Sequence, residues 1–227
     1  MKVIVFDIGG TLMEYVGMPH SWAGYYKQGF EAVNEKYALG GTESDIEIAV
    51  EILKQYNPRI HYREEELSAE FLFSKAMAHW GKNIDLNDCI DTFFEGFALK
   101  AIIYPDSVPM LKKLKSMGYS IAALTDIPSA MPDELFKRDI PKLLGLFDLY
   151  VSSQNCGYRK PNTAGLKLIA EHFGVPINEL VFVGDEEKDR KTAENAHCRF
   201  IQINRKEKFS GSICNLEELT VLLEYER

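Results

Sequence analysis

Four short polar motifs in this sequence of 227 residues contain the residue types that phosphate chemistry requires. The first begins with Asp7, whose carboxylate ends a run of β-branched and aromatic residues and is followed by Gly9 and Gly10. Glycines let the backbone approach an anion closely. An anionic substrate bound there would lie beside Asp7, whose carboxylate could then attack phosphorus or carbon as a covalent nucleophile. A strand-ending Asp in a tight turn is the alternative interpretation of this segment.

The second and third motifs would supply groups that bind phosphoryl oxygens. Thr125 and Asp126 follow an apolar run, and the Thr125 hydroxyl could donate a hydrogen bond to a phosphate. Lys160 lies just before a predicted helix, where its ammonium could neutralise charge that builds up at a reacting centre. Taken alone, either segment is also typical of a solvated loop.

The fourth motif places two carboxylates, Asp185 and Asp189, four residues apart after a further apolar run. This spacing can put both on one side of a helical turn, and carboxylate oxygens are the hard ligands that Mg²⁺ prefers. A solvated acidic loop is the alternative for this motif.

The segments before the motifs have the pattern of buried strands. Residues 3–6 are apolar without polar alternation, which favours a strand covered on both faces of a parallel sheet. Similar runs occur at 120–124, 149–152, 180–183 and 200–203. Helical periodicity lies between them, with start signals at Asp106 or Ser107 and at Asn162. We predict a Rossmann-like, doubly wound α/β core, in which ligands bind at the strand ends.

The stretch from residue 14 to residue 100 has a different pattern. It is rich in amphipathic helical periodicity and has no convincing strand; the helical segments are 22–37, 44–56, 64–80 and 86–99. We interpret it as an α-helical insertion that leaves the core after the first strand. The predicted domains are an α/β core of residues 1–13 and 101–227 and a helical insertion of residues 14–100.

The order of the motifs, each after its own predicted strand, resembles the haloacid dehalogenase-like hydrolase superfamily. The resemblance covers essentially the whole chain, although the insertion matches that superfamily's helical cap by position rather than by residues. It implies a hydrolase that acts on a small phosphorylated substrate under a closing cap.

The resemblance also implies roles for individual residues. Asp7 would attack the phosphoryl group and form an aspartyl phosphate, with Thr125 and Lys160 as catalytic partners. The substrate-binding residues would be Gly10, Thr125, Asp126 and Lys160. A Mg²⁺ cofactor would be held by the Asp7 carboxylate, the backbone carbonyl of Gly9, and Asp185, with Asp189 acting directly or through water.

Gly9 departs from the pattern of the superfamily's phosphatases, which carry a second Asp at this position to protonate the leaving oxygen. Losing a positioned general acid typically costs about 10²- to 10⁴-fold in rate. Three explanations stay open: an acyl phosphate that needs no acid, another acid such as Asp126 or Glu14, or a protein that binds phosphate ligands with little turnover.

Other branches of the superfamily also lack that Asp. A phosphonatase-like C–P hydrolase would need a lysine in the cap to form a Schiff base, and nothing in the sequence singles out Lys27, Lys36 or Lys54. A 2-haloacid dehalogenase would have no reason to keep the Asp185 and Asp189 pair. Phosphate ester or anhydride hydrolysis is therefore the preferred prediction.

Composition limits the partners and the location. The formal net charge of −8 argues against a surface that collects nucleic-acid phosphates. The apolar run before Asp7 is too short for a signal peptide or a membrane span, and the four cysteines are scattered. We expect a cytoplasmic protein that binds neither nucleic acid nor membrane. The sequence gives no indication of the oligomeric state.

Overall fold

A computed structural model describes residues 2–80, 85–207 and 210–224. The chain divides into two compact units. The α/β unit comprises Met1–Glu14, Ala101–Asp126 and Lys137–Arg227, and the helical unit comprises Tyr15–Lys100 and Ile127–Phe136. The sequence prediction assigned residues 127–136 to the α/β core, whereas the structure groups them with the helices.

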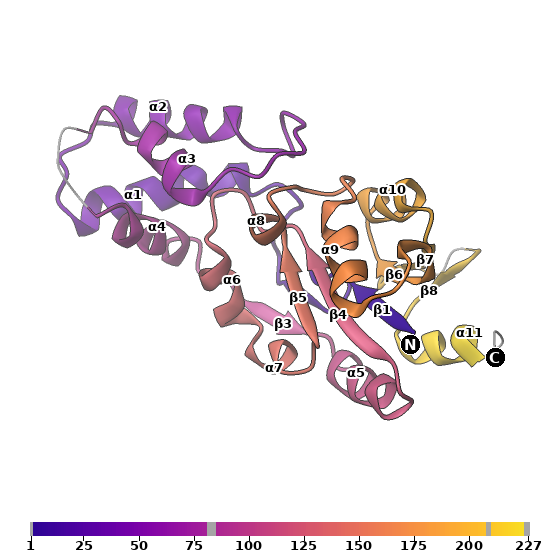
Figure 1. The fold of residues 1–227 in the computed structure, drawn as a ribbon. Coiled ribbons are helices and arrows are strands. Elements are labelled where there is room, and N and C mark those ends of the chain that lie inside the picture. Colours follow the sequence, from indigo (N-terminus) through magenta and orange to yellow (C-terminus); the bar gives the residue numbers. More distant parts are fainter. Residues whose placement is uncertain (1, 81–84, 208–209, 225–227) are drawn as a thin grey trace. The chain divides into compact units, whose positions relative to one another are not determined.

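The α/β unit is built on a parallel sheet with the strand order β5-β4-β1-β6-β7-β8 (Figure 1). The strands are β1 (Val3–Phe6), β4 (Ser120–Thr125), β5 (Leu149–Ser152), β6 (Val181–Gly184), β7 (Arg199–Ile203) and β8 (Ser212–Ile213). All described pairings between them are parallel. Because β1 lies between β4 and β6, the strands that precede three of the four motifs are neighbours.

Helices flank this sheet. The first, α5 (Ser107–Ser116), packs against β4, while α9 (Ala164–Phe173) contacts β4 and β5, and α10 (Glu187–Ala196) contacts β6 and β7. One core cluster joins Val5, Phe182 and Ile169 with apolar residues of α10. Every residue of β1 is buried, as expected for a central strand of a parallel sheet. The predicted Rossmann-like α/β fold is confirmed.

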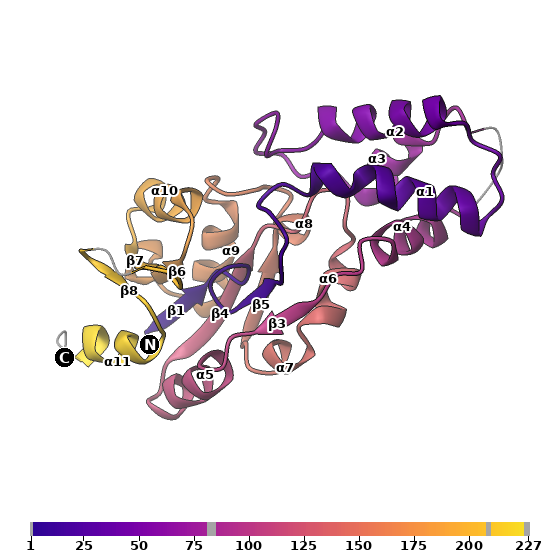
Figure 2. The same ribbon diagram turned by 180° about the vertical axis from the view of Figure 1, so that it is seen from behind.

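Several short elements complete the α/β unit. β2 (Met13–Tyr15) and β3 (Ala101–Ile103) form a separate two-stranded sheet (Figure 2). The remaining helices are α6 (Asp133–Asp139), which spans the boundary between the units, α7 (Pro141–Leu144), α8 (Ser153–Cys156), the 3₁₀ helix η2 (Ile177–Glu179) and α11 (Glu217–Glu224). The sequence pattern did not predict β2, β3 or β8, because runs of two or three residues carry too little periodicity.

The helical unit contains η1 (Trp22–Tyr25), α1 (Tyr26–Lys36), α2 (Glu43–Gln55), α3 (Ala69–Ala76) and α4 (Leu86–Glu95). Its core is an aromatic cluster in which the Phe93 ring contacts Phe30 at 4.9 Å and Phe73 at 5.0 Å between centroids. Gly29 permits close packing of α1, since a Cβ there would meet the Phe93 ring. None of the helices in the described part of the chain has the length and apolar character that crossing a bilayer requires.

Candidate active site

The carboxyl ends of three adjacent strands bring the predicted residues together. Asp7 directly follows β1, Thr125 ends β4 and precedes Asp126, and Asp185 directly follows β6. Asp7 and Thr125 are almost fully buried, whereas Asp126 and Asp185 are half-buried, although the Asp126 side chain itself is only 4% exposed. Thr125 is paired in register with Ser152 of β5. Polar side chains that gather at the ends of parallel strands mark the usual ligand position of such a sheet.

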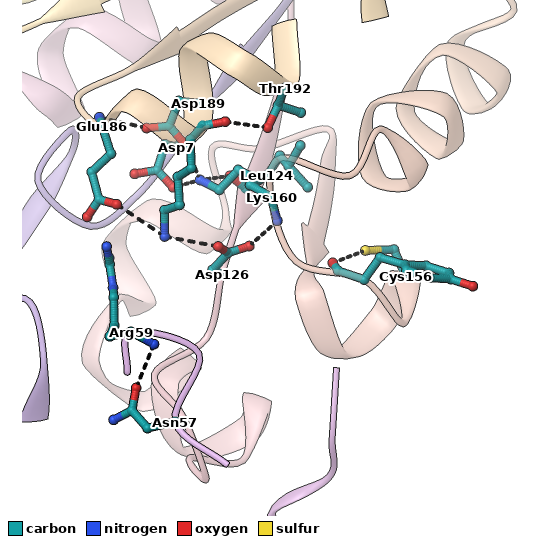
Figure 3. A network of polar contacts seen from close by, with 12 residues as sticks. Asp7, Asn57, Arg59, Leu124, Asp126, Cys156, Lys160, Glu186, Asp189 and Thr192 are labelled. Atoms are coloured by element: carbon teal, nitrogen blue, oxygen red, sulfur yellow. Dashed lines mark hydrogen bonds and ion pairs between the residues drawn. The ribbon is translucent and has the colours of Figure 1, made fainter. Parts of the chain in front are cut away.

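Lys160 connects these residues from the loop before α9. Its Nζ lies 2.6 Å from Oδ1 of Asp7 and 2.6 Å from Oδ1 of Asp189 (Figure 3). The side chain is only 2% exposed. Burial by itself lowers the pKa of the ammonium, but Asp189, Asp7 and Asp126 together raise it well above its ordinary value. Lys160 therefore provides a fixed positive charge beside the Asp7 carboxylate.

Asp189 uses both carboxylate oxygens within the protein. Oδ1 pairs with Lys160, and Oδ2 accepts a 2.9 Å hydrogen bond from the backbone N–H of Glu186. That second bond is part of a capping box at the start of α10. Gly184 allows this arrangement, because a Cβ there would lie 2.6 Å from Asp189. Asp189 is thus suited to orienting Lys160 and the end of β6.

Asp185 is held in place by the loop that follows Asp7. The Thr11 hydroxyl donates a 3.2 Å hydrogen bond to Oδ1 of Asp185. Gly10 has a φ of +79°, and a Cβ there would overlap the Asp185 carboxylate, so this position requires glycine. The sequence motif predicted Asp185 and Gly10 as site residues, but it gave no signal for the contact with Thr11.

Asp126 lies between two lysines. Its Oδ1 accepts a 3.0 Å hydrogen bond from the backbone N–H of Lys160, and its Oδ2 accepts a 2.9 Å bond from Nζ of Lys188. Burial by itself raises the pKa of Asp126, but the positive charges of Lys188, Arg159 and Lys160 lower it by more, so that the pKa lies well below its ordinary value. Asp126 is therefore ionised near neutral pH. Lys188 was not predicted as a site residue; its Nζ also lies 3.4 Å from Oε2 of Glu186.

The carboxylates of Asp7, Asp185 and Asp189 have oxygens that all lie within 4.8 Å of one another. Burial, together with Asp189 and Asp185, raises the pKa of Asp7 well above its ordinary value, although Lys160 acts in the opposite direction. This concentration of buried negative charge, made of hard oxygen donors, fits a divalent cation such as Mg²⁺.

Gly9 lies at the exposed start of the loop after Asp7. Its φ is outside the left-handed region, and a Cβ added to it would meet no atom within 4 Å. Neither backbone conformation nor space therefore requires glycine here, in contrast to Gly10. The position could hold the Asp that phosphatases of the resembled superfamily carry.

Comparison with known proteins agrees with this geometry. The profile of the haloacid dehalogenase-like hydrolases matches residues 1–197. The chain belongs to the haloacid dehalogenase-like hydrolases. This match extends well beyond half of the chain and includes all four motifs, so the predicted family and the prediction of a hydrolase are confirmed.

Relatives named phosphoglycolate phosphatases match over most of their length. A phosphoglycolate phosphatase of Aliivibrio fischeri is 24% identical over 87% of this chain and 82% of its own. A phosphoglycolate phosphatase of Cereibacter sphaeroides is 27% identical over 88% of this chain and 84% of its own.

Solved structures share the fold at low identity. A haloacid dehalogenase-like phosphatase from Thermococcus onnurineus superposes with a TM-score of 0.63, 21% identity and 98% coverage of both chains. A 2-haloacid dehalogenase from Pseudomonas syringae pv. Tomato gives a TM-score of 0.65 at 19% identity over both whole chains. Since both a phosphatase and a dehalogenase have this fold, the activity must be argued from the site.

Proposed function

We propose that this protein is a Mg²⁺-dependent phosphatase of small phosphorylated metabolites that works through an aspartyl phosphate on Asp7. The observation that carries the proposal is the buried Asp7 carboxylate, held 2.6 Å from Lys160 within a group of three clustered carboxylates. A dehalogenase that attacks carbon has no use for this acidic group, whereas a phosphatase needs it to hold the divalent cation that balances the charge of a phosphate.

In the proposed reaction an oxygen of Asp7 attacks phosphorus, and the bond from phosphorus to the leaving oxygen breaks with its electron pair on that oxygen. Lys160 and the Thr125 hydroxyl bind the phosphoryl oxygens, and Lys160 also holds Asp7 in place. Water then attacks phosphorus, and the bond between phosphorus and the Asp7 oxygen breaks with its electron pair on that oxygen. This regenerates the Asp7 carboxylate and releases phosphate, which carries away the protons of the water. Asp126 fixes the Lys160 backbone for both steps.

The metal would be bound by Asp7, Asp185 and the carbonyl of Gly9. Asp189 would support it indirectly, since both of its oxygens already have partners. When bound, Mg²⁺ would neutralise the buried carboxylates and the charge on the transferred phosphoryl group. Thr11 and Gly10 would keep Asp185 in position for this role.

Gly9 points to substrates with good leaving groups. Asp126 is poorly suited to replace the missing acid, because it is ionised and both its oxygens accept hydrogen bonds from lysines. Glu14, the other acid considered, is exposed on β2 and accepts a 3.1 Å bond from the Tyr104 hydroxyl. We therefore infer a preference for acyl or aryl phosphates over alkyl phosphates, and phosphoglycolate is the alkyl substrate that the relatives' names suggest.

The three lysines considered for a phosphonatase give that alternative no support. Lys27, Lys36 and Lys54 lie on the helical unit, and each pairs with a glutamate and is at least 37% exposed. The pKa of Lys27 is raised by its hydrogen bond to Glu43. A lysine that forms a Schiff base needs the opposite shift, toward the neutral amine.

The first test is an assay of phosphate release from acetyl phosphate, nitrophenyl phosphate, phosphoglycolate, nucleotides and sugar phosphates, with Mg²⁺ or with a chelator. We expect metal-dependent turnover that Asp7→Asn abolishes, and acid-quenched samples should contain phosphorylated Asp7 by mass spectrometry. Asp148→Asn is the matched control, because Asp148 also pairs with a lysine, Lys115, but precedes β5 at the other end of the sheet. Turnover that survives Asp7→Asn, or is indifferent to Mg²⁺, would refute the proposal.

A further inference from the structure

Arg205 holds the loop that follows the nucleophile. From beyond the end of β7, its Nη2 and Nε donate hydrogen bonds of 2.6 and 3.2 Å to the carbonyl oxygen of Thr11. Its Nη1 lies 2.6 Å from Oδ2 of Asp106, and the guanidinium stacks 4.4 Å above the ring of Tyr104. With four contacts and a side chain only 13% exposed, Arg205 has little conformational freedom.

The side chain of Asp106 binds Arg205 and does not cap the helix α5 that follows it. The sequence predicts Asp106 or Ser107 as the N-cap of this helix; the structure places Asp106 at the N-cap position, but its side chain makes no capping hydrogen bond. Instead Oδ2 binds Arg205 and also accepts a 2.8 Å bond from the backbone N–H of Leu216. A carboxylate that gives up a favourable cap in order to orient an arginine indicates that the position of the guanidinium matters.

Thr11 carries this restraint to the carboxylate cluster. Its carbonyl is bound by Arg205, and its hydroxyl donates to Asp185. The neighbouring Leu12 carbonyl is held independently, by the Ser107 hydroxyl at 2.8 Å and the Tyr104 N–H at 3.0 Å. Arg205 therefore binds the backbone carbonyl of Thr11, the residue of this loop whose side-chain hydroxyl contacts Asp185.

We propose that Arg205 is a positioning residue for the metal site, acting through Thr11 on Asp185. This inference rests on the proposed Mg²⁺ site, and Arg205 lies outside residues 1–197, which the family profile matches. Without the guanidinium, the Thr11 carbonyl loses two hydrogen bonds, although the Leu12 N–H of the same peptide still bonds the Ile8 carbonyl at 2.8 Å. The Thr11 hydroxyl then fixes the Asp185 carboxylate less firmly. The ligand set must then be ordered when the metal binds, which weakens binding.

The test measures Mg²⁺ affinity by isothermal titration calorimetry without substrate, in wild type, Arg205→Met and Arg205→Lys. Groups that orient metal ligands typically change affinity by about 10- to 100-fold, so we expect at least about tenfold weaker binding in Arg205→Met. Arg205→Lys should be intermediate, because an ammonium keeps the charge but not the planar set of donors. The control is Lys115→Ala, which removes a cation that likewise bonds a carbonyl, of Leu146, and a carboxylate, of Asp148.

A double-mutant cycle separates positioning from simple stabilisation. Thr11→Val removes the hydroxyl but keeps the carbonyl that Arg205 binds, so Arg205→Met should have little further effect on Mg²⁺ affinity in that background. Chemical rescue is a second readout: Arg205 lines a cavity of about 370 Å³, and guanidinium ions should restore Mg²⁺ affinity to Arg205→Ala but not affect Lys115→Ala.

The outcomes distinguish this inference from the proposed function. If wild type binds no Mg²⁺ and releases no phosphate, the proposed function fails. If wild type binds Mg²⁺ but Arg205→Met and Arg205→Lys bind it equally well, the positioning role is refuted while the function stands. Equal losses of Mg²⁺ affinity in Arg205→Met and Lys115→Ala, or additive effects with Thr11→Val, would refute it as well.

Discussion

The carboxyl group of Asp185 couples the predicted metal site to pH. Burial, followed by the charges of Asp189 and Glu186, raises its pKa from 3.8 to about 6. The folded form therefore binds this proton more tightly than the unfolded chain does. The contribution of this group to stability is present at low pH and is lost as pH rises from 3.8 through about 6.

A metal that binds the ionised carboxylate must displace that proton. We therefore expect Mg²⁺ to raise the melting temperature clearly at about pH 7.5 and only weakly at about pH 5, because affinity falls about tenfold per unit below the pKa for each proton released. Differential scanning fluorimetry with and without Mg²⁺ measures the effect. Asp185→Asn should remove it at both values, and an equal Mg²⁺ effect at both would contradict the assignment of Asp185 as a ligand.

Gly9 offers a gain-of-function test at the same scale. Gly9→Asp should fold normally, since its φ is not left-handed and a Cβ meets no atom within 4 Å. A restored general acid should raise kcat/KM for alkyl phosphates by about 10²-fold or more, with a smaller gain for acetyl phosphate, whose leaving group needs no proton. Gly10→Ala is the control for crowding and should lose activity on both. An equal change on alkyl and acyl phosphates would argue against an acid role.

At the scale of elements, Asp126 joins three segments that are distant in the sequence. It follows β4, accepts the backbone N–H of Lys160 before α9, and pairs with Lys188 on α10. Its side chain is 4% exposed, so removing it leaves the Lys160 N–H without this acceptor and deprives the Lys188 ammonium of one of its two carboxylate partners.

We expect Asp126→Ala to lower the free energy of unfolding by about 3–5 kcal/mol, because it breaks a buried network by deleting one partner. Asp148→Ala is the comparison: it also loses a lysine and a backbone N–H, of Ile121, but its side chain is 35% exposed. Asp148→Ala should lower the free energy of unfolding by about 1 kcal/mol or less. Urea denaturation followed by circular dichroism measures both, and equal costs would show that burial does not govern the difference.

Five of the six strands of the parallel sheet, all except β8, could be predicted because each contains a short apolar run, and the runs of β1, β4 and β6 end directly in a polar motif. This pattern placed Asp7, Thr125 and Asp185 at one edge of the sheet, and the structure brings these three to adjacent strand ends. The metal and substrate roles of these residues remain predictions.

Other site contacts could not be predicted, because they join residues far apart in the chain. Arg205 and Thr11 are 194 positions apart, and Lys188 and Asp126 are 62 apart. Patterns of neighbouring residues carry no information about contacts between residues so far apart in the sequence. Asp106 shows the same limit, since its position before a helix predicts a cap, while a residue 99 positions away determines its partner.

At the scale of the whole molecule, the two units have separate cores. The helical unit centres on Phe93, whereas Phe182 belongs to the sheet of the α/β unit and lies 5.7 Å beneath Nζ of Lys160. Both tryptophans of the sequence, Trp22 and Trp80, are in the helical unit. Tryptophan fluorescence therefore reports on that unit, and Mg²⁺ binding at the proposed site would report on the α/β unit.

This separation predicts different effects for two equally buried phenylalanines. Phe93→Ala should cost about 3–5 kcal/mol in the unfolding transition seen by tryptophan fluorescence, through the cavity it leaves. Mg²⁺ affinity should stay within about twofold of wild type, since Phe93 belongs to the core of the helical unit and the clustered carboxylates belong to the α/β unit. Phe182→Ala should instead weaken Mg²⁺ binding, because the ring supports the lysine that holds Asp7 and Asp189. If Phe93→Ala weakened Mg²⁺ binding as strongly as Phe182→Ala in protein that is still folded, the two cores would have to act as one.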